Sequence, residues 1–210
     1  MFMNRHEAGQ KLAHKLKKYE DAKPLILALP RGGVPVAYEV AQALKAPLDI
    51  FVVRKVGAPW NPEFGVGAVA PGVQILDEHS LHTLGLKPTD LQETIEREQQ
   101  EVKRRQELYQ QKAPPHLQGK TIILIDDGIA TGITIRAAIK AIQAFKPAQL
   151  ILAVPVGPKD TLQVLNDLVD EVICLEMPKD FYAVSTFYRD FPQVSDEEVL
   201  NLLKKNKKRK

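Results

Sequence analysis

One stretch constrains the fold more than any other: residues 122–134, with the sequence Ile-Ile-Leu-Ile-Asp-Asp-Gly-Ile-Ala-Thr-Gly-Ile-Thr. Four aliphatic residues in a row are typical of a strand that is buried on both faces, as in a parallel sheet. Asp126 and Asp127 follow, then a loop of small residues, and residues 135–145 are expected to form a helix. The loop amides and the helix dipole attract an anion, while two carboxylates can accept hydrogen bonds from sugar hydroxyls. The stretch therefore predicts a site for a ribose and its phosphate.

Strand and helix patterns alternate through the rest of the chain. Further aliphatic runs predict buried strands at residues 25–29, 48–53, 150–154 and 171–175. Helical patterns occur at residues 5–19, at 34–44, before residue 168 and after Ser195. This alternation predicts an α/β fold with a mostly parallel, twisted sheet flanked by helices.

An insertion interrupts the alternation at about residues 66–115. Residues 56–67 hold three glycines, two prolines and the only tryptophan, which predicts a mobile loop. Residues 66–70 and 73–76, joined by Pro71-Gly72, predict a small hairpin, and a charged helix is then expected up to about Lys112. We therefore predict a single domain over residues 1–203 that contains this insertion.

Composition bounds the class of protein. The chain has 210 residues with 44% hydrophobic and 26% charged residues, and no apolar run reaches the roughly 18 residues that a membrane span needs. Residues 204–210 carry six of the 29 cations and no acid, so the rest holds 23 basic against 26 acidic residues. We expect this basic tail to be disordered and solvated; the alternative is an electrostatic contact with nucleic acid. The charged N-terminus and the single cysteine, Cys174, predict a cytoplasmic protein.

Two further loops follow predicted strands, and the carboxyl ends of parallel strands are where ligands gather. Arg31-Gly32-Gly33 follows the first strand, where glycines let the backbone approach an anion and Arg31 can add a charge-assisted bond. Arg54 and Lys55 follow the second strand. The alternatives are a tight strand-to-helix turn for the first loop and a merely solvated cation for the second.

The order of these loops resembles the type I phosphoribosyltransferase family. The stretch at 122–134 is similar to the family signature that binds 5-phosphoribosyl 1-pyrophosphate (PRPP), and Pro-Arg-Gly-Gly is similar to its pyrophosphate loop. The segment after Arg54 and Lys55 corresponds to the flexible loop that closes over the substrate. With its Phe-Tyr-Ala-Val and Ser-Asp-Glu-Glu-Val ending, the chain looks closest to the uncharacterised bacterial predicted-phosphoribosyltransferase branch.

The resemblance implies transfer of ribose 5-phosphate from PRPP to a nucleobase-like acceptor, with release of pyrophosphate, in nucleotide metabolism. Asp127, Arg54 and Lys55 would be catalytic: Asp127 as a candidate base, and Arg54 or Lys55 as the cation that neutralises pyrophosphate. Mg²⁺ would be carried by PRPP oxygens and water rather than by protein ligands. A homodimer is also implied. The implied PRPP-binding residues are Arg31, Gly32, Gly33, Asp126, Asp127, Ala130, Thr131, Gly132, Ile133 and Thr134.

Two features leave alternatives open. Five of the twelve Phe and Tyr residues fall within residues 181–191, so Phe181 and Tyr182 could form a C-terminal hood over the acceptor, or the segment could bury against the core. Ile133 stands where many relatives have a glycine. Its amide can still reach a phosphate, but its side chain could crowd the pocket. The rival functions are a non-catalytic regulator that binds PRPP or a nucleotide, and a hydrolase or phosphorylase acting on a nucleotide or phosphosugar.

Overall fold

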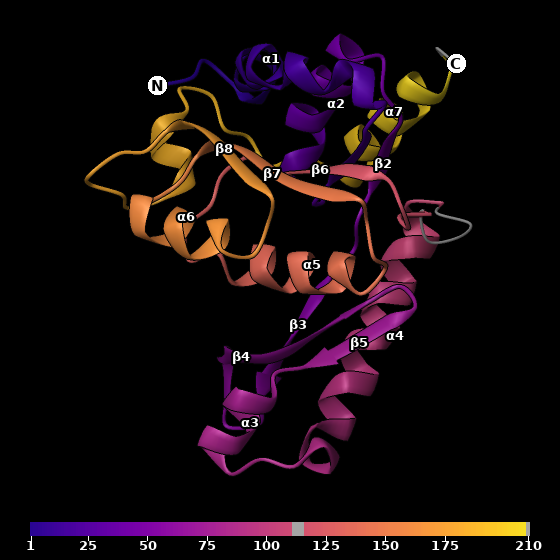
Figure 1. Cartoon of the computed structure of the whole chain (residues 1–210), viewed down its shortest axis with the longest axis vertical. Helices are drawn as coiled ribbons and strands as arrows, with labels where there is room; N and C mark the ends of the chain where they lie inside the picture. Colours follow the sequence, from indigo (N-terminus) through magenta and orange to yellow (C-terminus); the bar gives the residue numbers. More distant parts are fainter. Residues whose placement is uncertain (111–115, 209–210) are drawn as a thin grey trace. The chain divides into compact units, whose positions relative to one another are not determined.

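The computed structural model describes residues 1–110 and 116–208, which form two compact units (Figure 1). The first unit consists of Met1–Phe51, Leu117–Gly132 and Lys146–Lys210, and the second of Val52–His116 and Ile133–Phe145. Within the described ranges, no helix has the length and apolar character needed to cross a membrane.

A parallel five-stranded sheet forms the centre of the first unit, with strand order β2-β1-β6-β7-β8. The aliphatic run before the acidic pair is the middle strand, and its residues 122–125 are fully buried. This arrangement confirms the predicted α/β fold with a parallel sheet. The strands are β1 (Leu25–Ala28), β2 (Leu48–Ile50), β6 (Thr121–Ile125), β7 (Gln149–Val156) and β8 (Glu171–Glu176).

The first unit also contains the helices that precede and follow these strands in the sequence. Gly9 of the first helix allows close packing on the second, since a Cβ at Gly9 would lie 2.6 Å from the carbonyl oxygen of Val36. Leu12 and Leu16 of the first helix, and Tyr19 of the short helix that follows it, are buried. The helices are α1 (Arg5–Leu16), η1 (Lys17–Ala22), α2 (Gly33–Ala43), α6 (Lys159–Asn166), η3 (Val184–Phe187) and α7 (Asp196–Lys207).

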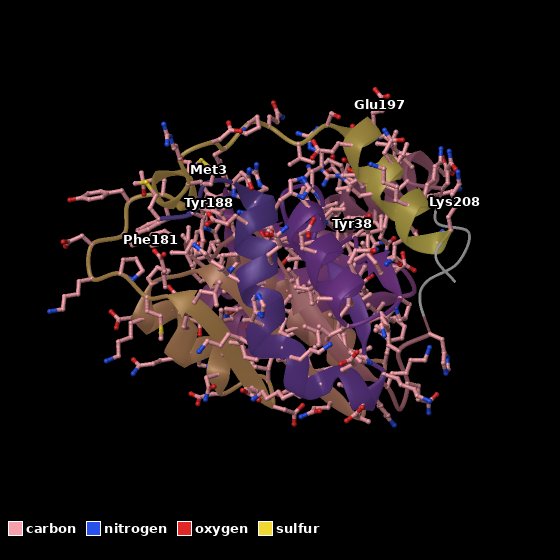
Figure 2. The ribbon with its side chains drawn as sticks, turned by 90° about the horizontal axis from the view of Figure 1, so that it is seen from above. Met3, Tyr38, Phe181, Tyr188, Glu197 and Lys208 are labelled. Carbon is pink, nitrogen blue, oxygen red and sulfur yellow. The ribbon has the colours of Figure 1, made fainter. Side chains whose placement is uncertain are left out.

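The last helix, α7, includes part of the segment predicted to be a disordered tail. Ser195 caps it as expected, its hydroxyl accepting a hydrogen bond from the Glu198 amide at 3.1 Å. Residues 204–207 are helical, so the prediction of disorder is wrong for them; residues 209–210 lie outside the described residues. The reason is Asn206, which is buried and accepts a hydrogen bond from the Leu48 amide at 3.0 Å. Figure 2 labels Glu197 and Lys208 near the two ends of this helix.

The second unit holds an antiparallel sheet of order β3-β4-β5, whose strands all contact helix α5. The hairpin predicted from residues 66–76 is confirmed, with Gly72 at φ 77° in its turn. The elements are β3 (Arg54–Ala58), β4 (Asn61–Ala70), β5 (Val73–Leu76), α3 (Glu78–Leu84), η2 (Pro88–Leu91), α4 (Gln92–Leu108) and α5 (Ile133–Gln143).

Two boundaries differ from the prediction. The second parallel strand ends at Ile50, and the expected loop after Arg54 and Lys55 is the β3–β4 pair instead. A Cβ at Gly57 would lie 2.4 Å from the carbonyl oxygen of Pro62, so this glycine permits close pairing at a bulge rather than a loop. The charged helix ends at Leu108, whereas its predicted end at Lys112 lies outside the described residues.

The predicted insertion at residues 66–115 falls inside the second unit, which begins earlier, at Val52. The second unit also takes in α5, which follows the loop of the acidic pair in the sequence. That both units make up one domain stays a prediction.

The hydrogen bonds of Asn206 predict how much the anchoring of α7 contributes to the free energy of unfolding. Asn206→Ala removes the acceptor for the buried Leu48 amide and the donor to the Ala46 carbonyl, and we expect the free energy of unfolding to fall by about 1–3 kcal/mol. Asn201→Ala, at an exposed position of the same helix, is the matched control. Equal urea midpoints for the two variants would show that α7 does not depend on this anchor.

Candidate active site

The acidic pair lies directly after β6, at the carboxyl end of the middle strand. The Asp127 amide donates to Asp126 Oδ1 at 2.9 Å. Arg5, the first residue of α1, donates from its Nε to Asp127 Oδ2 at 2.8 Å. The side chains of Arg5 and Asp127 are only 9% and 15% exposed. A charged hydrogen bond of this kind compensates part of the cost of burying a carboxylate.

Burial governs the protonation of the pair. It raises the pKa of Asp126 well above the ordinary value, and the neighbouring charge of Asp127 raises this pKa further. Burial also raises the pKa of Asp127, but there the hydrogen bond and charge of Arg5 act in the opposite direction. Of the two carboxyl groups, Asp127 therefore has the stronger tendency to stay ionised.

Tyr188 supports the same loop from the C-terminal segment. Its hydroxyl donates to the backbone carbonyl of Asp127 at 2.6 Å, and burial followed by the charge of Asp127 raises its pKa. Its ring packs on Phe2 and Phe191, with centroids 5.4 and 4.9 Å apart (Figure 2 labels Tyr188 beside Met3). Sequence reasoning missed both Arg5 and Tyr188 as site residues.

The Arg31-Gly32-Gly33 turn lies against the acidic pair, as the sequence predicted for strand ends. A Cβ at Gly32 would lie 2.1 Å from Asp127 Oδ2, and one at Gly33 would lie 2.7 Å from the carbonyl oxygen of Ile125. A side chain at Gly33 would therefore collide with this backbone, and one at Gly32 would have to displace the Asp127 carboxyl group that Arg5 binds. Arg31 is half-exposed, with its Nη1 3.8 Å from Asp196 Oδ2, and the Pro30–Arg31 peptide bond is cis.

The small loop after the acidic pair is held by α6. Thr161 of α6 donates to the Ala130 carbonyl at 3.2 Å, and a Cβ at Gly132 would lie 2.8 Å from Thr161 Cγ2. Gly132 has φ 72°, which favours glycine. Thr131 is exposed. The next residue, Ile133, begins α5, so its amide and that of Thr134 belong to the first turn of that helix.

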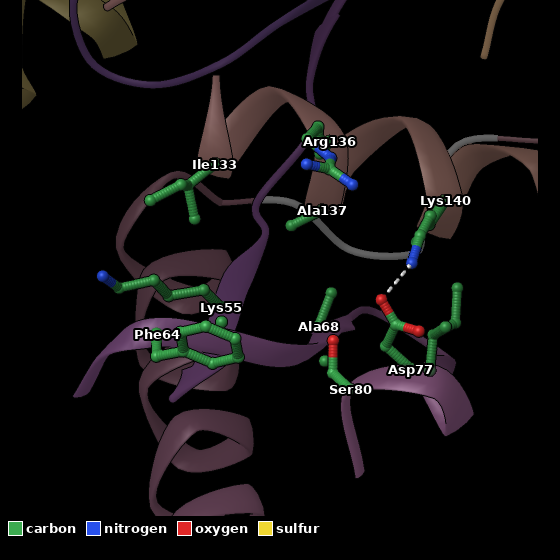
Figure 3. A pocket seen from close by; sticks show the side chains of 12 residues that line it. Lys55, Phe64, Ala68, Asp77, Ser80, Ile133, Arg136, Ala137 and Lys140 are labelled. Atoms are coloured by element: carbon green, nitrogen blue, oxygen red, sulfur yellow. Dashed lines mark hydrogen bonds and ion pairs between the residues drawn. The ribbon is translucent and has the colours of Figure 1, made fainter. Parts of the chain in front are cut away.

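The two candidate cations of the second unit have different surroundings. Arg54 Nε donates to Glu98 Oε2 at 2.8 Å, and Glu98 is buried. Lys55 lines a cavity of about 270 Å³ between the β3–β5 sheet and α5 (Figure 3). Ile133 lines it too: a Cβ built at Gly65 of β4 would lie 3.6 Å from Ile133 Cγ2.

The two residues predicted to form the acceptor hood, Phe181 and Tyr182, have different surroundings. Phe181 stacks on Phe187 with ring centroids 5.3 Å apart and is partly buried beside the Phe2–Tyr188 cluster, whereas Tyr182 is 88% exposed. Tyr188 is buried. The segment is held close to the acidic pair, because a Cβ at Gly128 would lie 2.6 Å from Val184 Cγ1. Of the five aromatic residues of the segment, Tyr188 is therefore the one that is fully buried, while Phe181, Phe187 and Phe191 are partly buried and Tyr182 is exposed. The hood itself stays a prediction.

A family model described as "Phosphoribosyl transferase domain" matches residues 3–192. The chain belongs to this family. The resemblance seen in the sequence is thereby confirmed.

Relatives of this phosphoribosyl transferase domain extend the comparison. A Mycobacterium tuberculosis protein named "Putative phosphoribosyl transferase" is 41% identical over 208 residues, which are 97% of this chain and 46% of that protein. The chain thus spans about half the length of the curated relatives it matches. The crystal structure of TT1426 from Thermus thermophilus is 38% identical, with a TM-score of 0.90 over 97% of each chain. The AQ2163 protein from Aquifex aeolicus, at 12% identity and a TM-score of 0.51 over 82% of this chain and 73% of its own, shares the fold.

The predicted site residues thus fall into two groups. The structure brings the Arg31-Gly32-Gly33 turn together with Asp126 and Asp127. Arg54, Lys55, Ile133 and Thr134 belong to the second unit, and their roles beside the acidic pair stay predictions. In the part of the chain that the structure describes, no group of three or more His, Cys, Asp or Glu side chains could hold a metal ion.

The close approach of Gly32 to the acidic pair predicts intolerance of any side chain there. Gly32→Ala would force the turn and Asp127 apart, and we expect a loss of about 1–3 kcal/mol in the free energy of unfolding. Gly65→Ala is the control, because its Cβ would make only an ordinary contact at 3.6 Å. Thermal or urea unfolding measures both; a Gly32→Ala protein as stable as the control would refute the close approach.

Proposed function

We propose that this domain transfers ribose 5-phosphate from PRPP to a nucleobase-like acceptor and releases pyrophosphate. The observation that supports this most is the contact between the Arg31-Gly32-Gly33 turn and the acidic pair at the ends of the neighbouring strands β1 and β6. An anion-binding turn beside two carboxylates suits a substrate that carries both a pyrophosphate and a ribose diol. Family membership supports the same reaction.

Each part of the site then has a role. Asp126 and Asp127 accept hydrogen bonds from the ribose hydroxyls, and the backbone of Gly32 and Gly33 with Arg31 receives the pyrophosphate. The amides of residues 130–134 and the hydroxyls of Thr131 and Thr134 hold the 5-phosphate at the start of α5. Tyr182 offers an exposed ring on which a planar acceptor could stack.

Mg²⁺ fits this site as an ion that arrives with PRPP. The carboxylate Oδ2 of Asp127 already accepts from Arg5, so the pair offers few free oxygens for direct coordination. Mg²⁺ prefers to keep several waters and to bind phosphate oxygens, and when bound it supplies positive charge against the pyrophosphate. A homodimer and a cytoplasmic location complete the proposal on the strength of the resemblance.

Turnover with a panel of bases tests the reaction. We expect the protein, given PRPP and Mg²⁺, to release pyrophosphate only when one particular base is present. Asp126→Asn combined with Asp127→Asn should weaken PRPP binding at least tenfold, because the pair that binds the ribose hydroxyls loses its negative charge. Asp160→Asn, an exposed carboxyl of the same unit, is the matched control.

The other outcomes separate the rival functions. Tight PRPP binding with no turnover for any base would overturn the enzyme and favour a regulator. Release of pyrophosphate or of a base from a nucleotide without an acceptor would favour a hydrolase or phosphorylase. Unchanged PRPP affinity in the doubly substituted protein would refute the assignment of the acidic pair.

Of the two candidate cations, we assign the neutralisation of pyrophosphate to Lys55, because its side chain lines the cavity beside α5, whereas that of Arg54 binds the buried Glu98. Lys55→Ala should lower the rate of transfer by roughly 100-fold, as for the loss of one group that stabilises developing charge. Arg54→Ala should chiefly lower the free energy of unfolding, since it leaves the buried Glu98 without this partner. Steady-state rates and urea midpoints for both variants decide the matter, and the reverse pattern would exchange the two roles.

A further inference from the structure

Arg5 is the single buried cation among the described residues. Its Nε donates to Asp127 Oδ2 at 2.8 Å, and its Nη1 donates to the Pro192 carbonyl at 2.7 Å. Its guanidinium carbon lies 3.6 Å from the centroid of the Phe191 ring. Three partners from two distant parts of the chain therefore fix this side chain in a single orientation.

The charges around the acidic pair are unequal. Asp126 and Asp127 bring two carboxyl groups into a largely buried place, and Arg5 brings one positive charge. Tyr188 is neutral and binds the Asp127 carbonyl through its hydroxyl, and the charge of Glu176 also acts on this phenol. Arg31 is half-exposed and lies toward Asp196. Two buried carboxylates close together cannot both ionise easily against one cation.

We propose that Arg5 is a positioning residue that keeps Asp127 ionised and fixes the direction of its carboxylate, while Asp126 holds the proton that the pair retains. This inference rests on the proposed function and changes the role of Asp126 in it. Asp126, in its protonated form, can donate one hydrogen bond to the ribose diol instead of only accepting from it. Asp127 accepts a hydrogen bond from the ribose and is not the base that the sequence suggested.

The chemistry of the arginine side chain suits this role. Guanidinium is planar, always charged and weakly hydrated, so it can pair with a carboxylate, bond a carbonyl and stack on a ring at the same time. A lysine at position 5 would supply the charge without the stacking or the second fixed donor. Tyr188 holds the same loop from its carbonyl side without adding charge, so it provides a matched comparison for a purely structural support.

The test is the pH dependence of PRPP binding in three variants. Arg5 lowers the pKa of Asp127, so removing the Arg5 guanidinium should raise that pKa. If PRPP binding needs ionised Asp127, binding should then fall off at a higher pH as the solution is acidified. We expect Arg5→Gln to move the acidic limb of the binding profile upward by about one pH unit or more. In Arg5→Lys the acidic limb should stay close to its wild-type position, because lysine supplies the charge. Tyr188→Phe should weaken binding without moving the limb.

A second readout does not depend on PRPP. The carboxyl ¹³C resonances of Asp126 and Asp127 in the ligand-free protein, assigned with Asp126→Asn, should show Asp127 titrating below Asp126. The reverse order, or an unmoved limb in a folded Arg5→Gln protein, would overturn the proposal. If Arg5→Gln does not fold, the ¹³C titration alone decides. If the wild-type protein binds no PRPP but Asp127 titrates below Asp126, the proposed function is refuted while the role of Arg5 is supported.

Discussion

The burial of two adjacent carboxyl groups at the end of β6 is the constraint on which the rest of the first unit depends. A buried charge without a partner costs far more than a typical domain can tolerate. Two hydrogen bonds offset this cost. The Asp127 amide donates to Asp126 within the loop, and Arg5, far away in the sequence, donates to Asp127. The N-terminal segment and the aromatic segment are both held at the acidic pair for this reason.

This constraint accompanies the pairing of the N-terminal segment with residues 187–189. Backbone hydrogen bonds join Phe2 to Phe187 and Arg189, and the Phe2 side chain is buried against Tyr188. Arg5 can reach Asp127 because this pairing places the start of α1 beside the carboxyl end of the sheet. Tyr188 of this segment thus supports the acidic pair, while its most exposed ring, Tyr182, is open to solvent.

Local patterns in the sequence predicted much of the fold. The strands β1, β6, β7 and β8 follow from aliphatic runs, and the close approach of Gly32 and Gly33 follows from the position of the turn after a strand. The partners of Asp127 could not be predicted in the same way, since Arg5 lies 122 positions away and Tyr188 lies 61 positions away. A buried arginine at the start of an otherwise charged helix has no local signal that separates it from a solvated one. The β3–β4 pair was missed because glycine and proline indicate a loop unless a partner strand is known.

The alternation of side chains along a strand separates the roles of the adjacent cations Arg54 and Lys55, which the sequence could not distinguish. Successive side chains of a strand point to opposite faces, so two neighbours in β3 cannot share one role. Arg54 faces α4, where Glu98 is buried and binds it, while Lys55 lines the cavity beside α5 (Figure 3). Once Arg54 and Lys55 are placed in a strand rather than a loop, one of them is committed to holding the unit together. Lys55, on the other face of the strand, is the cation that we assign to the pyrophosphate.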